Sequence, residues 1–375
     1  MEQKKIHPIL YIITKLEMGG AQKVCLSLFK KFSTDSKTAW LISGSEGHLV
    51  EEIKHHKNVI LLPSLKREIV WKDFAAFWHI FCEIKKLKAQ HPNLIVHTHS
   101  TKAGYLGRWA AWCVGIKTII HTVHGFGFHD HQSKIGYTIA YLLERLTNII
   151  TTRYICVSSA DIKIGLKKFP HFKKKYSLIR AAVDDLQLIP AKKEFTFDGS
   201  CTFGTIACFK PQKNLFDLLE AFKQVHFYQP QTKLEIIGDG TQRPLIERWI
   251  QKHHLTSAIT LHGWQENPAI FMHNWDCFVL SSLWEGLPCA AVEARFLKIP
   301  VISYNIGGLT DIIEHGKNGY LCQVKNKALL AHYMTLVAQN NYVRHALGSY
   351  EQDLNAFTQA TMLNLHQDLY CQSKK

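Results

Sequence analysis

The sequence predicts an α/β protein with two domains, each built on a doubly wound parallel sheet. Three observations support this. The 375 residues exceed what one hydrophobic core usually organises. Short apolar runs alternate with helical stretches along most of the chain. This alternation stops near residues 184–200, where proline, lysine and glycine interrupt it, and then starts again. We therefore expect two Rossmann-like domains facing across a cleft, at residues 1–190 and 191–350. Residues 351–375 should form a C-terminal helix that packs back on the first domain.

The first half alternates buried strands with helices, as βα units require. Apolar runs predict strands at residues 9–14, 40–43, 59–62, 94–98, 118–123 and 155–158. Helices are expected after Gly19-Gly20, at 49–56 and 66–90, after the strand at 94–98, and at 160–169. The glycine pair after the first strand opens a helix, and a helix N-terminus offers free backbone N–H groups to a phosphate.

The second half repeats the pattern. Strands are expected at residues 203–208, 233–237, 259–261, 277–280 and 300–304. Helices are expected at residues 215–228, 244–253 and, continuously, 328–368. The stretch at 281–311 runs from a polar loop through a helix and a strand to the turn Gly307-Gly308, the arrangement by which parallel sheets hold phosphate and sugar ligands. It places Glu285 in the loop and Glu293 in the helix.

The net charge of +15 is confined almost entirely to the first half. Residues 1–190 contain 28 Lys/Arg and 14 Asp/Glu, a difference of +14; residues 191–375 contain 17 and 16, a difference of +1. This asymmetry indicates either an anionic partner for the first domain or merely a basic, soluble surface. No known nucleic-acid-binding module is recognisable there, so a nucleic-acid partner is not expected.

Two basic segments are candidates for such contacts. Residues 66–90 predict a helix whose aromatic side chains either face the core or lie on anionic lipid; they are Trp71, Phe74, Phe77, Trp78 and Phe81. Residues 163–180 contain the lysine cluster of KKFPHFKKK, which predicts either a solvated loop or a contact to a membrane surface or a phosphate-bearing acceptor.

Cysteine usage and the apolar runs predict the compartment. The ten cysteines never form a CxxC pair, and several lie in apolar runs, which is typical of free thiols in a reducing compartment. No run approaches the ~18–20 apolar residues that span a bilayer. The N-terminal segment contains His7 and Pro8 and lacks a small-residue cleavage site, so we expect a first strand rather than a signal peptide. A cytoplasmic location follows.

Several kinds of site are disfavoured. The glycine turn at Gly238 and the loop at Gly19-Gly20 both lack the dinucleotide fingerprint, which argues against a nicotinamide or flavin enzyme. Six histidines lie between His97 and His131, but no acidic or cysteine partner has metal-ligand spacing, so we expect no metal. His124, which follows a strand and precedes a glycine, is the better candidate for an active-site contact.

The motifs, taken in order, resemble the retaining GT-B glycosyltransferases of the large family four. WEGLPCAAVEA is similar to their E-x7-E signature through Glu285 and Glu293. MGGAQK resembles the first glycine loop, KPQKN the donor-phosphate loop, and GGLTDII the second glycine loop. HTHSTKAGYLGR followed by TVHGFGFH is similar to members that build bacterial surface polysaccharide. ICVSSAD and IRAAVD match the end of the family's first domain.

This resemblance implies transfer of a sugar from a UDP- or GDP-sugar to a glycan or polyprenyl-diphosphate-linked acceptor, with retention and without a cofactor. The first domain would bind the acceptor, peripherally at the inner face of the cytoplasmic membrane, and the second domain would bind the nucleotide sugar. Glu285 would hold the donor sugar, together with the backbone of Gly286, Leu287 and Pro288. Glu293 would bind the ribose. The remaining donor contacts implied are Lys213, Gly19, Gly20, Lys210 and Gly308 around the diphosphate, and His124 near the reaction centre. A fixed ammonium and helix N-termini stabilise the charge of a departing diphosphate.

One position departs from the family pattern. Members usually carry an arginine five residues before the phosphate-loop lysine, and this chain has Cys208 there. Either Lys210 supplies the missing charge or Lys213 acts alone. Two alternatives therefore remain beside the transferase: a nucleotide-sugar epimerase or phosphorylase on the same two-domain plan, and a non-catalytic sugar-nucleotide-binding subunit.

Overall fold

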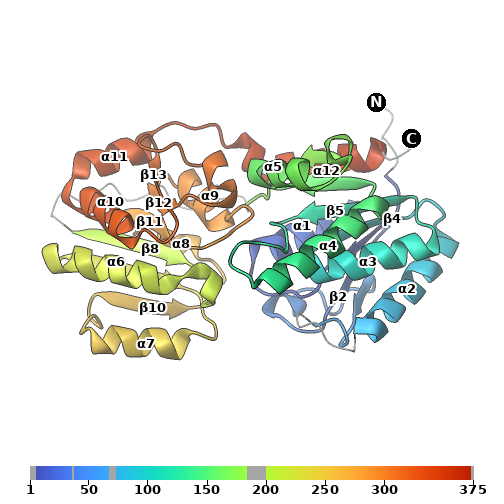
Figure 1. Ribbon diagram of the computed structural model, residues 1–375, viewed down its shortest axis with the longest axis horizontal. Coiled ribbons are helices and arrows are strands. Elements are labelled where there is room, and N and C mark those ends of the chain that lie inside the picture. Colours follow the sequence, from blue (N-terminus) through green and yellow to red (C-terminus); the bar gives the residue numbers. More distant parts are fainter. Residues whose placement is uncertain (1–5, 36–37, 67–72, 184–199, 373–375) are drawn as a thin grey trace. The chain divides into compact units, whose positions relative to one another are not determined.

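The computed structural model describes residues 6–35, 38–66, 73–183 and 200–372, which form two compact α/β units (Figure 1). Unit 1 comprises residues 1–182 together with 356–375, and unit 2 comprises residues 183–355. Apart from its last residue, the linker expected at 184–200 lies outside the described residues. Within the described residues, no helix is long and apolar enough to cross a bilayer.

Unit 1 is built on a seven-stranded sheet in the order β3-β2-β1-β4-β5-β6-β7, with every described pairing parallel. The strands are β1 (Ile9–Ile12), β2 (Ala39–Ser43), β3 (Val59–Leu61), β4 (Ile95–His99), β5 (Thr118–Val123), β6 (Arg153–Cys156) and β7 (Tyr176–Leu178). All residues of β1 and β4 are buried, as expected for central strands covered on both faces.

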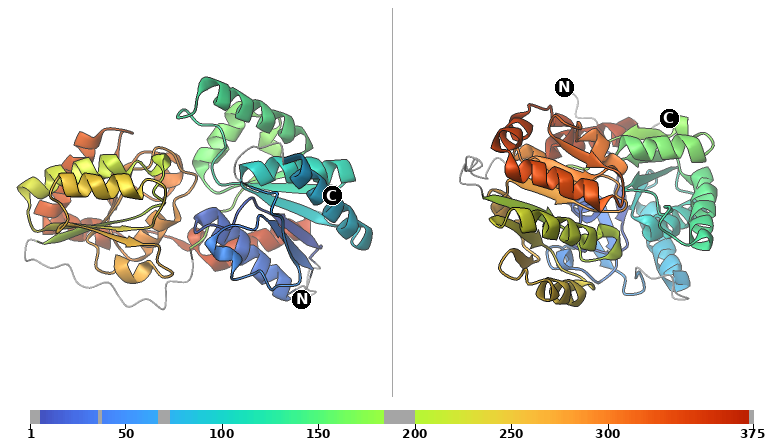
Figure 2. Two further views of the ribbon diagram at one scale, coloured as in Figure 1. Left: turned by 90° about the horizontal axis from the view of Figure 1, so that it is seen from below. Right: turned by 60° about the vertical axis from the view of Figure 1, so that its left-hand side comes forward.

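Helices cover both faces of this sheet (Figures 1 and 2). They are α1 (Gly20–Asp35), α2 (Asp73–Gln90), α3 (Thr101–Val114), α4 (Lys134–Ile150), α5 (Ser159–Lys168) and α12 (Gln359–Gln372). α2, α3 and α4 lie side by side on one face, and α1 and α12 lie together on the other. Capping side chains fix two helix starts: Ser133 accepts a hydrogen bond from the N–H of Gly136, and Ser158 accepts one from Asp161.

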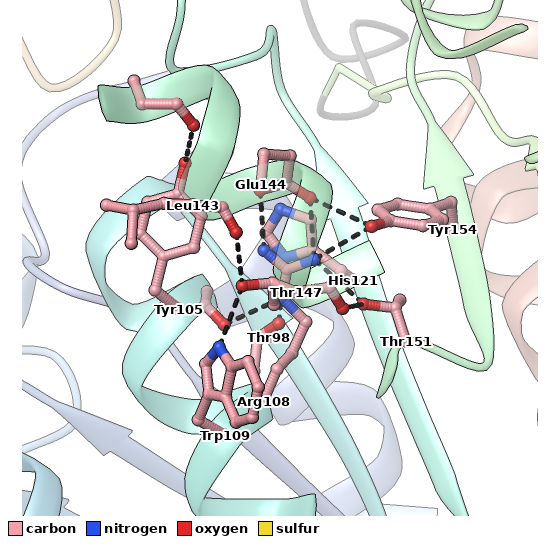
Figure 3. A network of polar contacts seen from close by, with 12 residues as sticks. Thr98, Tyr105, Arg108, Trp109, His121, Leu143, Glu144, Thr147, Thr151 and Tyr154 are labelled. Atoms are coloured by element: carbon pink, nitrogen blue, oxygen red, sulfur yellow. Dashed lines mark hydrogen bonds and ion pairs between the residues drawn. The ribbon is translucent and has the colours of Figure 1, made fainter. Parts of the chain in front are cut away.

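A buried ion pair joins α3 to α4 (Figure 3). Both Arg108 and Glu144 are excluded from solvent, and two parallel hydrogen bonds of 2.8 Å connect the guanidinium to the carboxylate. Arg108 also donates to the hydroxyl groups of Thr151 and Tyr154 and to the carbonyl of Gly104. Burial of two charges is tolerated only when such partners satisfy them. The polar side of α4 is therefore fixed against the domain interior.

Unit 2 is built on a six-stranded parallel sheet in the order β10-β9-β8-β11-β12-β13. The strands are β8 (Cys201–Ile206), β9 (Thr232–Ile237), β10 (Ile259–Gly263), β11 (Cys277–Leu280), β12 (Val301–Tyr304) and β13 (Gly319–Cys322). The helices are α6 (Leu215–Tyr228), α7 (Arg243–Lys252), α8 (Ala269–Met272), α9 (Cys289–Phe296), α10 (Lys327–Gln339) and α11 (Asn341–Ser349). The chain thus reverses direction across the sheet between β8 and β11, which is where such sheets bind ligands.

The prediction of one continuous helix at 328–368 is wrong, because α10, α11 and α12 occupy this region separately. Asn340 ends α10, and its side chain accepts a hydrogen bond from the N–H of Val343 to begin α11. The helix expected at 49–56 is also wrong. His48–Val50 is a single 3-10 turn followed by irregular turns, since so short a segment forms too few bonds to offset helix nucleation.

The aromatic residues of α2 do not form its core-facing side. Ala76, Ile80, Ile84 and Leu87 do so at helical spacing, whereas Phe77 and Phe81 are only partly buried at the edge of that core. Phe74 and Trp78 are exposed, and Trp71 lies outside the described residues. The segment at 163–180 likewise differs from a solvated loop, because it contains most of α5 and all of the edge strand β7.

Candidate active site

Three loops of unit 2 follow the neighbouring strands β8, β11 and β12 at the carboxyl edge of the sheet. The first loop holds Lys210 and Lys213, the second holds Glu285, and the third holds Gly307 and Gly308. Parallel strands bring consecutive loops to the same edge, so residues almost 100 positions apart in sequence meet here.

The side chains of Lys213 and Glu285 form the centre of this edge. The Lys213 Nζ lies 2.5 Å from Oε1 of Glu285, and both side chains are largely but not fully buried. Charge-assisted hydrogen bonds of this kind are short and strong. Each charge therefore compensates the other, and a ligand that reaches either group must compete with this pair.

Backbone contacts fix the two loops to each other. The side-chain Nε2 of Gln212 donates to the carbonyl of Trp284, and its backbone carbonyl accepts from the N–H of Leu283, both at 2.8 Å. The hydroxyl of Ser281 donates to the carbonyls of Lys213 and Asn214 at 3.0 Å. The Lys213–Glu285 pair is consequently held by a rigid frame and not only by its own attraction.

The glycine turn after β12 packs on the backbone of the Glu285 loop. Gly307 has a φ of +48°, and a Cβ atom there would lie 2.1 Å from the carbonyl oxygen of Glu285. The N–H of Gly308 donates to the carbonyl of Gly286 at 2.6 Å. Only glycine permits this close approach and this backbone conformation. The second glycine loop therefore positions Glu285, Gly286, Leu287 and Pro288.

The remaining predicted donor contacts lie nearby in unit 2. Lys210 precedes the 3-10 turn Pro211–Lys213 and is half-buried, and its N–H donates to the carbonyl of Cys208. Glu293 lies on α9, also half-buried. Lys210 is thus only three residues before Lys213 in one ordered loop, which is consistent with a second cation on the phosphate side.

Sequence reasoning missed the support given to Asn214 and α6. The carboxylate of Asp217 accepts from the Asn214 amide at 2.6 Å and from the hydroxyl of Tyr304 at 2.7 Å. Asn214 itself has a φ of +48°, a conformation that asparagine tolerates better than most side chains. The pattern KN before a helix, with an aspartate three residues later, was the available signal.

In unit 1, Gly19 and Gly20 lie at the N-terminus of α1, as predicted. The adjacent end of β1 is connected to the end of β4. The Thr14 hydroxyl lies 2.7 Å from that of Ser100 and accepts from the N–H of Ala103 at 3.0 Å. Two helix N-termini, those of α1 and α3, therefore meet at the carboxyl edge of this sheet, where anionic ligands are favoured.

His124 follows β5 and contacts a histidine from the neighbouring strand. Its Nε2 lies 3.1 Å from Nδ1 of His99, the last residue of β4. Desolvation by burial, assisted by the nearby His366, lowers the pKa of His124 to about 3. Burial, with further contributions from His97 and His124, places the pKa of His99 well below its usual value. The lowered pKa values favour the neutral form of both rings, so the N–H of one ring donates a hydrogen bond to the bare nitrogen of the other.

The predicted role of His124 therefore depends on His99, which the sequence analysis did not single out as its partner. The signal was present, because HTH and TVH end adjacent parallel strands and so lie at one sheet edge. With its Nε2 directed at His99, His124 has Nδ1 left as the ring nitrogen available to another group.

Behind this pair, α12 closes a buried polar cluster. The hydroxyl of Tyr370 lies 2.7 Å from Nδ1 of His97 and accepts from Tyr11 at 3.2 Å. His366 donates from Nδ1 to the carbonyl of Met362, and burial lowers its pKa to about 4. The C-terminal helix thus supplies side chains to the core beneath His99 and His124.

Among the described residues, no group of three or more His, Cys, Asp or Glu side chains is arranged to hold a metal ion. All ten cysteines belong to the described part of the chain and are free thiols. The predicted site residues fall into two sets. Lys210, Lys213, Glu285, Glu293 and the second glycine loop lie in unit 2, while Gly19, Gly20 and His124 lie in unit 1.

Comparison with known proteins identifies the class. Residues 18–185 match the family profile described as Glycosyltransferase Family 4, and residues 191–353 match Glycosyl transferases group 1. Two structures share the fold over nearly the whole chain. Anabaena HepE in complex with UDP and glucose has a TM-score of 0.78 at 17% identity, covering 98% of this chain and 100% of that one. Sucrose-phosphate synthase from Thermosynechococcus elongatus has a TM-score of 0.82 at 18% identity, covering 98% of each chain. The fold is therefore the GT-B fold of glycosyltransferases.

Two related glycosyltransferases extend this result to the level of sequence. The chain is 30% identical over 321 residues to an Escherichia coli UDP-Gal:alpha-D-GlcNAc-diphosphoundecaprenol alpha-1,3-galactosyltransferase, covering 82% of each sequence. It is 23% identical over 313 residues to the Staphylococcus aureus capsular polysaccharide biosynthesis glycosyltransferase CapM, covering 80% of each. The chain belongs to this glycosyltransferase family, and it is a sugar-transferring enzyme.

Proposed function

We propose that this glycosyltransferase moves a sugar from a UDP-sugar, with UDP-galactose the first candidate, to a sugar carried on polyprenyl diphosphate during surface polysaccharide assembly. The observation that carries the proposal is the 30% identity to the E. coli galactosyltransferase over 82% of both chains, because that relative is named for this donor and this acceptor. The Lys213–Glu285 pair supplies chemistry suited to such a donor.

The proposed donor site uses the loops of unit 2. Lys213, supported by Lys210, would bind the diphosphate, whose negative charge increases as the sugar leaves. Glu285 would then exchange its bond to Lys213 for hydrogen bonds to sugar hydroxyls, and Glu293 would hold the ribose. In this scheme the lysines and helix N-termini carry the charge stabilisation, and we include no metal.

The proposed reaction keeps the anomeric configuration. No side chain is assigned as a nucleophile, so the acceptor hydroxyl attacks the face from which the diphosphate departs. The bond between the donor sugar and the diphosphate breaks as the new glycosidic bond forms, and the departing diphosphate takes the proton of the acceptor hydroxyl. His124, held neutral beside His99, would contact the donor sugar as a hydrogen-bonding group and not as a cation.

The proposed location is the inner face of the cytoplasmic membrane, where a polyprenyl-linked acceptor is embedded. The +14 excess of residues 1–190 supports this location, since anionic lipid attracts basic surfaces. An acceptor bound to lipid also requires its enzyme to approach the bilayer.

The proposal is tested with purified chain, radiolabelled UDP-galactose and a synthetic GlcNAc-diphosphate lipid with a short tail. Transfer with retention is expected, and Lys213→Ala should abolish it. A thermal-shift screen of UDP-, GDP- and ADP-sugars identifies the donor, because a ligand of the native state raises its stability. Conversion of the donor without acceptor would instead indicate an epimerase, and binding without any turnover would indicate a non-catalytic subunit.

A further inference from the structure

Helix α4 of unit 1 presents an apolar side to solvent. Its exposed aliphatic side chains recur at helical spacing and are Ile135, Ile139, Leu142, Leu146 and Ile149. Their exposed fractions range from 49% for Leu142 to 74% for Ile135. At 100° per residue these five side chains occupy an arc of about 80°, so they form one continuous stripe. Soluble helices normally turn such a stripe inward.

The opposite side of α4 faces the interior of unit 1, where Tyr137 and Tyr141 pack on an aromatic core and polar side chains form buried hydrogen bonds. Glu144 pairs with Arg108, and the hydroxyl of Thr147 accepts from Nε1 of Trp109 at 3.0 Å (Figure 3). Asn148 donates its amide to the carbonyl of Pro170 at 3.1 Å. Rotating α4 to bury the stripe would break these bonds and leave the charge of Arg108 buried without its partner. The exposure of the stripe is therefore enforced by the interior of unit 1.

The surroundings of α4 are strongly basic. Residues 130–182 contain ten Lys/Arg and three carboxylates, of which Glu144 and Asp161 are buried and Asp130 is exposed. On α4 itself, Lys134 and Arg145 are exposed beside the stripe. The neighbouring helix α5 adds exposed Lys163 and Lys167 together with exposed Ile164 and Leu166. Throughout this described segment, Asp130 is the one carboxylate exposed to solvent among many exposed Lys and Arg side chains.

This combination selects one occupant among three. A second copy of the chain packed through a two-fold axis would bring the same cations of both copies together. A protein partner is poorly indicated by a narrow stripe of isoleucine and leucine without a central aromatic or arginine anchor. An anionic bilayer offers hydrocarbon to the stripe and phosphate to the cations beside it.

We propose that α4 is the membrane-docking element of this enzyme, with the stripe in the interfacial region of an anionic bilayer and the cations of α4 and α5 against lipid phosphate. The inference rests on the proposed function only in that a lipid-linked acceptor requires a membrane approach. It also differs from the sequence-based alternatives, which offered residues 66–90 and 163–180 for such a contact and did not include α4.

The test is co-sedimentation of the full chain with vesicles of phosphatidylcholine containing about one-third phosphatidylglycerol, and with pure phosphatidylcholine vesicles. Ile139→Asp/Leu146→Asp should lower the partition coefficient for anionic vesicles at least about tenfold, since it places two charges in the stripe. Leu245→Asp/Ile270→Asp is the matched control, because both residues are exposed aliphatics of unit 2. It should bind as the wild type does.

Two further variants separate the electrostatic from the apolar contribution to vesicle binding, and α2 from α4. Lys134→Glu/Arg145→Glu should weaken binding to anionic vesicles and leave the weak binding to neutral vesicles unchanged; it also serves as the second variant if the aspartates prevent folding. Phe74→Asp/Trp78→Asp tests α2 directly. Loss of binding in the α2 variant, with normal binding in both α4 variants, would overturn the assignment.

Other outcomes are equally decisive. Absence of wild-type binding to anionic vesicles, or equal losses in the α4 and unit 2 variants, overturns the inference. A wild-type dimer that Ile139→Asp/Leu146→Asp converts to a monomer, without vesicle binding, would assign the stripe to a second copy. The α4 aspartate variant should retain transfer to a short-tailed, water-soluble acceptor. If the wild type transfers no sugar but binds vesicles through α4, the proposed function fails and this inference stands.

Discussion

The ammonium of Lys213 and the carboxylate of Glu285 form an ion pair of 2.5 Å across two loops of unit 2. Their loops follow strands that are neighbours in the sheet but separated by some 70 residues in the chain. A nucleotide-sugar diphosphate that binds here must take the lysine away from the glutamate. Under the proposed function, the two residues should therefore respond differently to substitution.

Replacing the lysine should abolish transfer. Lys213→Ala removes the cation that stabilises the departing diphosphate, so we expect kcat to fall at least about 100-fold. Steady-state transfer with UDP-galactose measures this, and Lys223→Ala, an exposed lysine of α6, is the control. Near-normal turnover by Lys213→Ala would remove this lysine from the mechanism.

Replacing the glutamate should separate chemistry from nucleotide binding. Glu285→Ala frees Lys213 from its partner, so the Kd of UDP should stay the same or decrease. Loss of the contacts to the sugar should nevertheless lower kcat by about 100-fold. Calorimetry with UDP and steady-state kinetics measure the two effects, with the exposed Glu266→Ala as control. A variant that weakens UDP binding but retains kcat would assign Glu285 to the nucleotide.

Glu293 should behave in the opposite way. Under the proposed function, Glu293→Ala would remove hydrogen bonds between its carboxylate and the ribose hydroxyls, each worth about 1.5–3 kcal/mol. The Kd values of UDP and of UDP-galactose should therefore rise together, by about 10- to 100-fold. Isothermal titration of both ligands checks this. An unequal rise, larger for the sugar nucleotide, would place Glu293 on the sugar instead.

The sequence predicted the two-sheet plan well because buried parallel strands are continuous apolar runs that need no partner to be recognised. It failed where the outcome depends on tertiary neighbours. Residues 134–150 carry Ile135, Ile139 and Leu142 at helical spacing, so the helix α4 was predictable from its periodicity and was missed. The exposure of that apolar side was not predictable, because it depends on the buried pair of Glu144 with Arg108 on α3. The edge strands β7 and β13 were missed because their sequences, YSL and GYLC, contain no long continuous apolar run and both strands are only partly buried.

The site was predicted in composition but not in geometry. Resemblance identified Lys213, Glu285 and the glycines, because each lies in a short motif with a fixed order along the chain. The ion pair between the first two could not be predicted from spacing, since it requires the adjacency of β8 and β11. The same holds for His99, whose contact to His124 depends on the pairing of β4 with β5.

The buried Arg108–Glu144 pair should dominate the stability of unit 1. Arg108→Met leaves the Glu144 carboxylate buried without its partner, so the free energy of unfolding should fall by about 3–5 kcal/mol. The exposed pair of Lys30 and Glu52, with a separation of 2.6 Å, is the comparison. Lys30→Met should lower the free energy of unfolding by less than about 1 kcal/mol. Urea unfolding measures both; equal effects would contradict the argument from burial.

Acid should destabilise the native state through the buried histidines of α12 and β4. Burial lowers the pKa of His366 to about 4 and keeps the pKa values of His97 and His99 well below 6.5. As pH falls below about 6.5, the histidines of the unfolded chain bind protons before those of the native state do. The free energy of unfolding is therefore highest above about pH 6.5 and decreases as the pH falls towards the pKa values of the folded state. Each histidine kept neutral should remove about 2 kcal/mol between pH 7 and pH 5.

The measurement is the free energy of unfolding at several pH values between 5 and 8. His366→Gln retains a donor for the carbonyl of Met362 but cannot titrate, so the slope against pH should decrease by up to one proton. Replacement of the exposed His332 by Gln should leave the slope nearly unchanged. If His366→Gln has the wild-type slope, protonation of this histidine does not couple to unfolding.

Because α12 contributes Tyr370 and His366 to the interior of unit 1, that unit cannot be completed while the chain is still being translated through unit 2. Residues 200–355 leave the ribosome before α12 does, so unit 2 can reach its native state while the N-terminal sheet still lacks this last helix. Newly made N-terminal sheets must wait, partly uncovered, for about 175 further residues of synthesis, which takes ~10–35 s at roughly 5–20 residues per second. The connectivity of one helix thus sets the order in which the two halves of this enzyme mature.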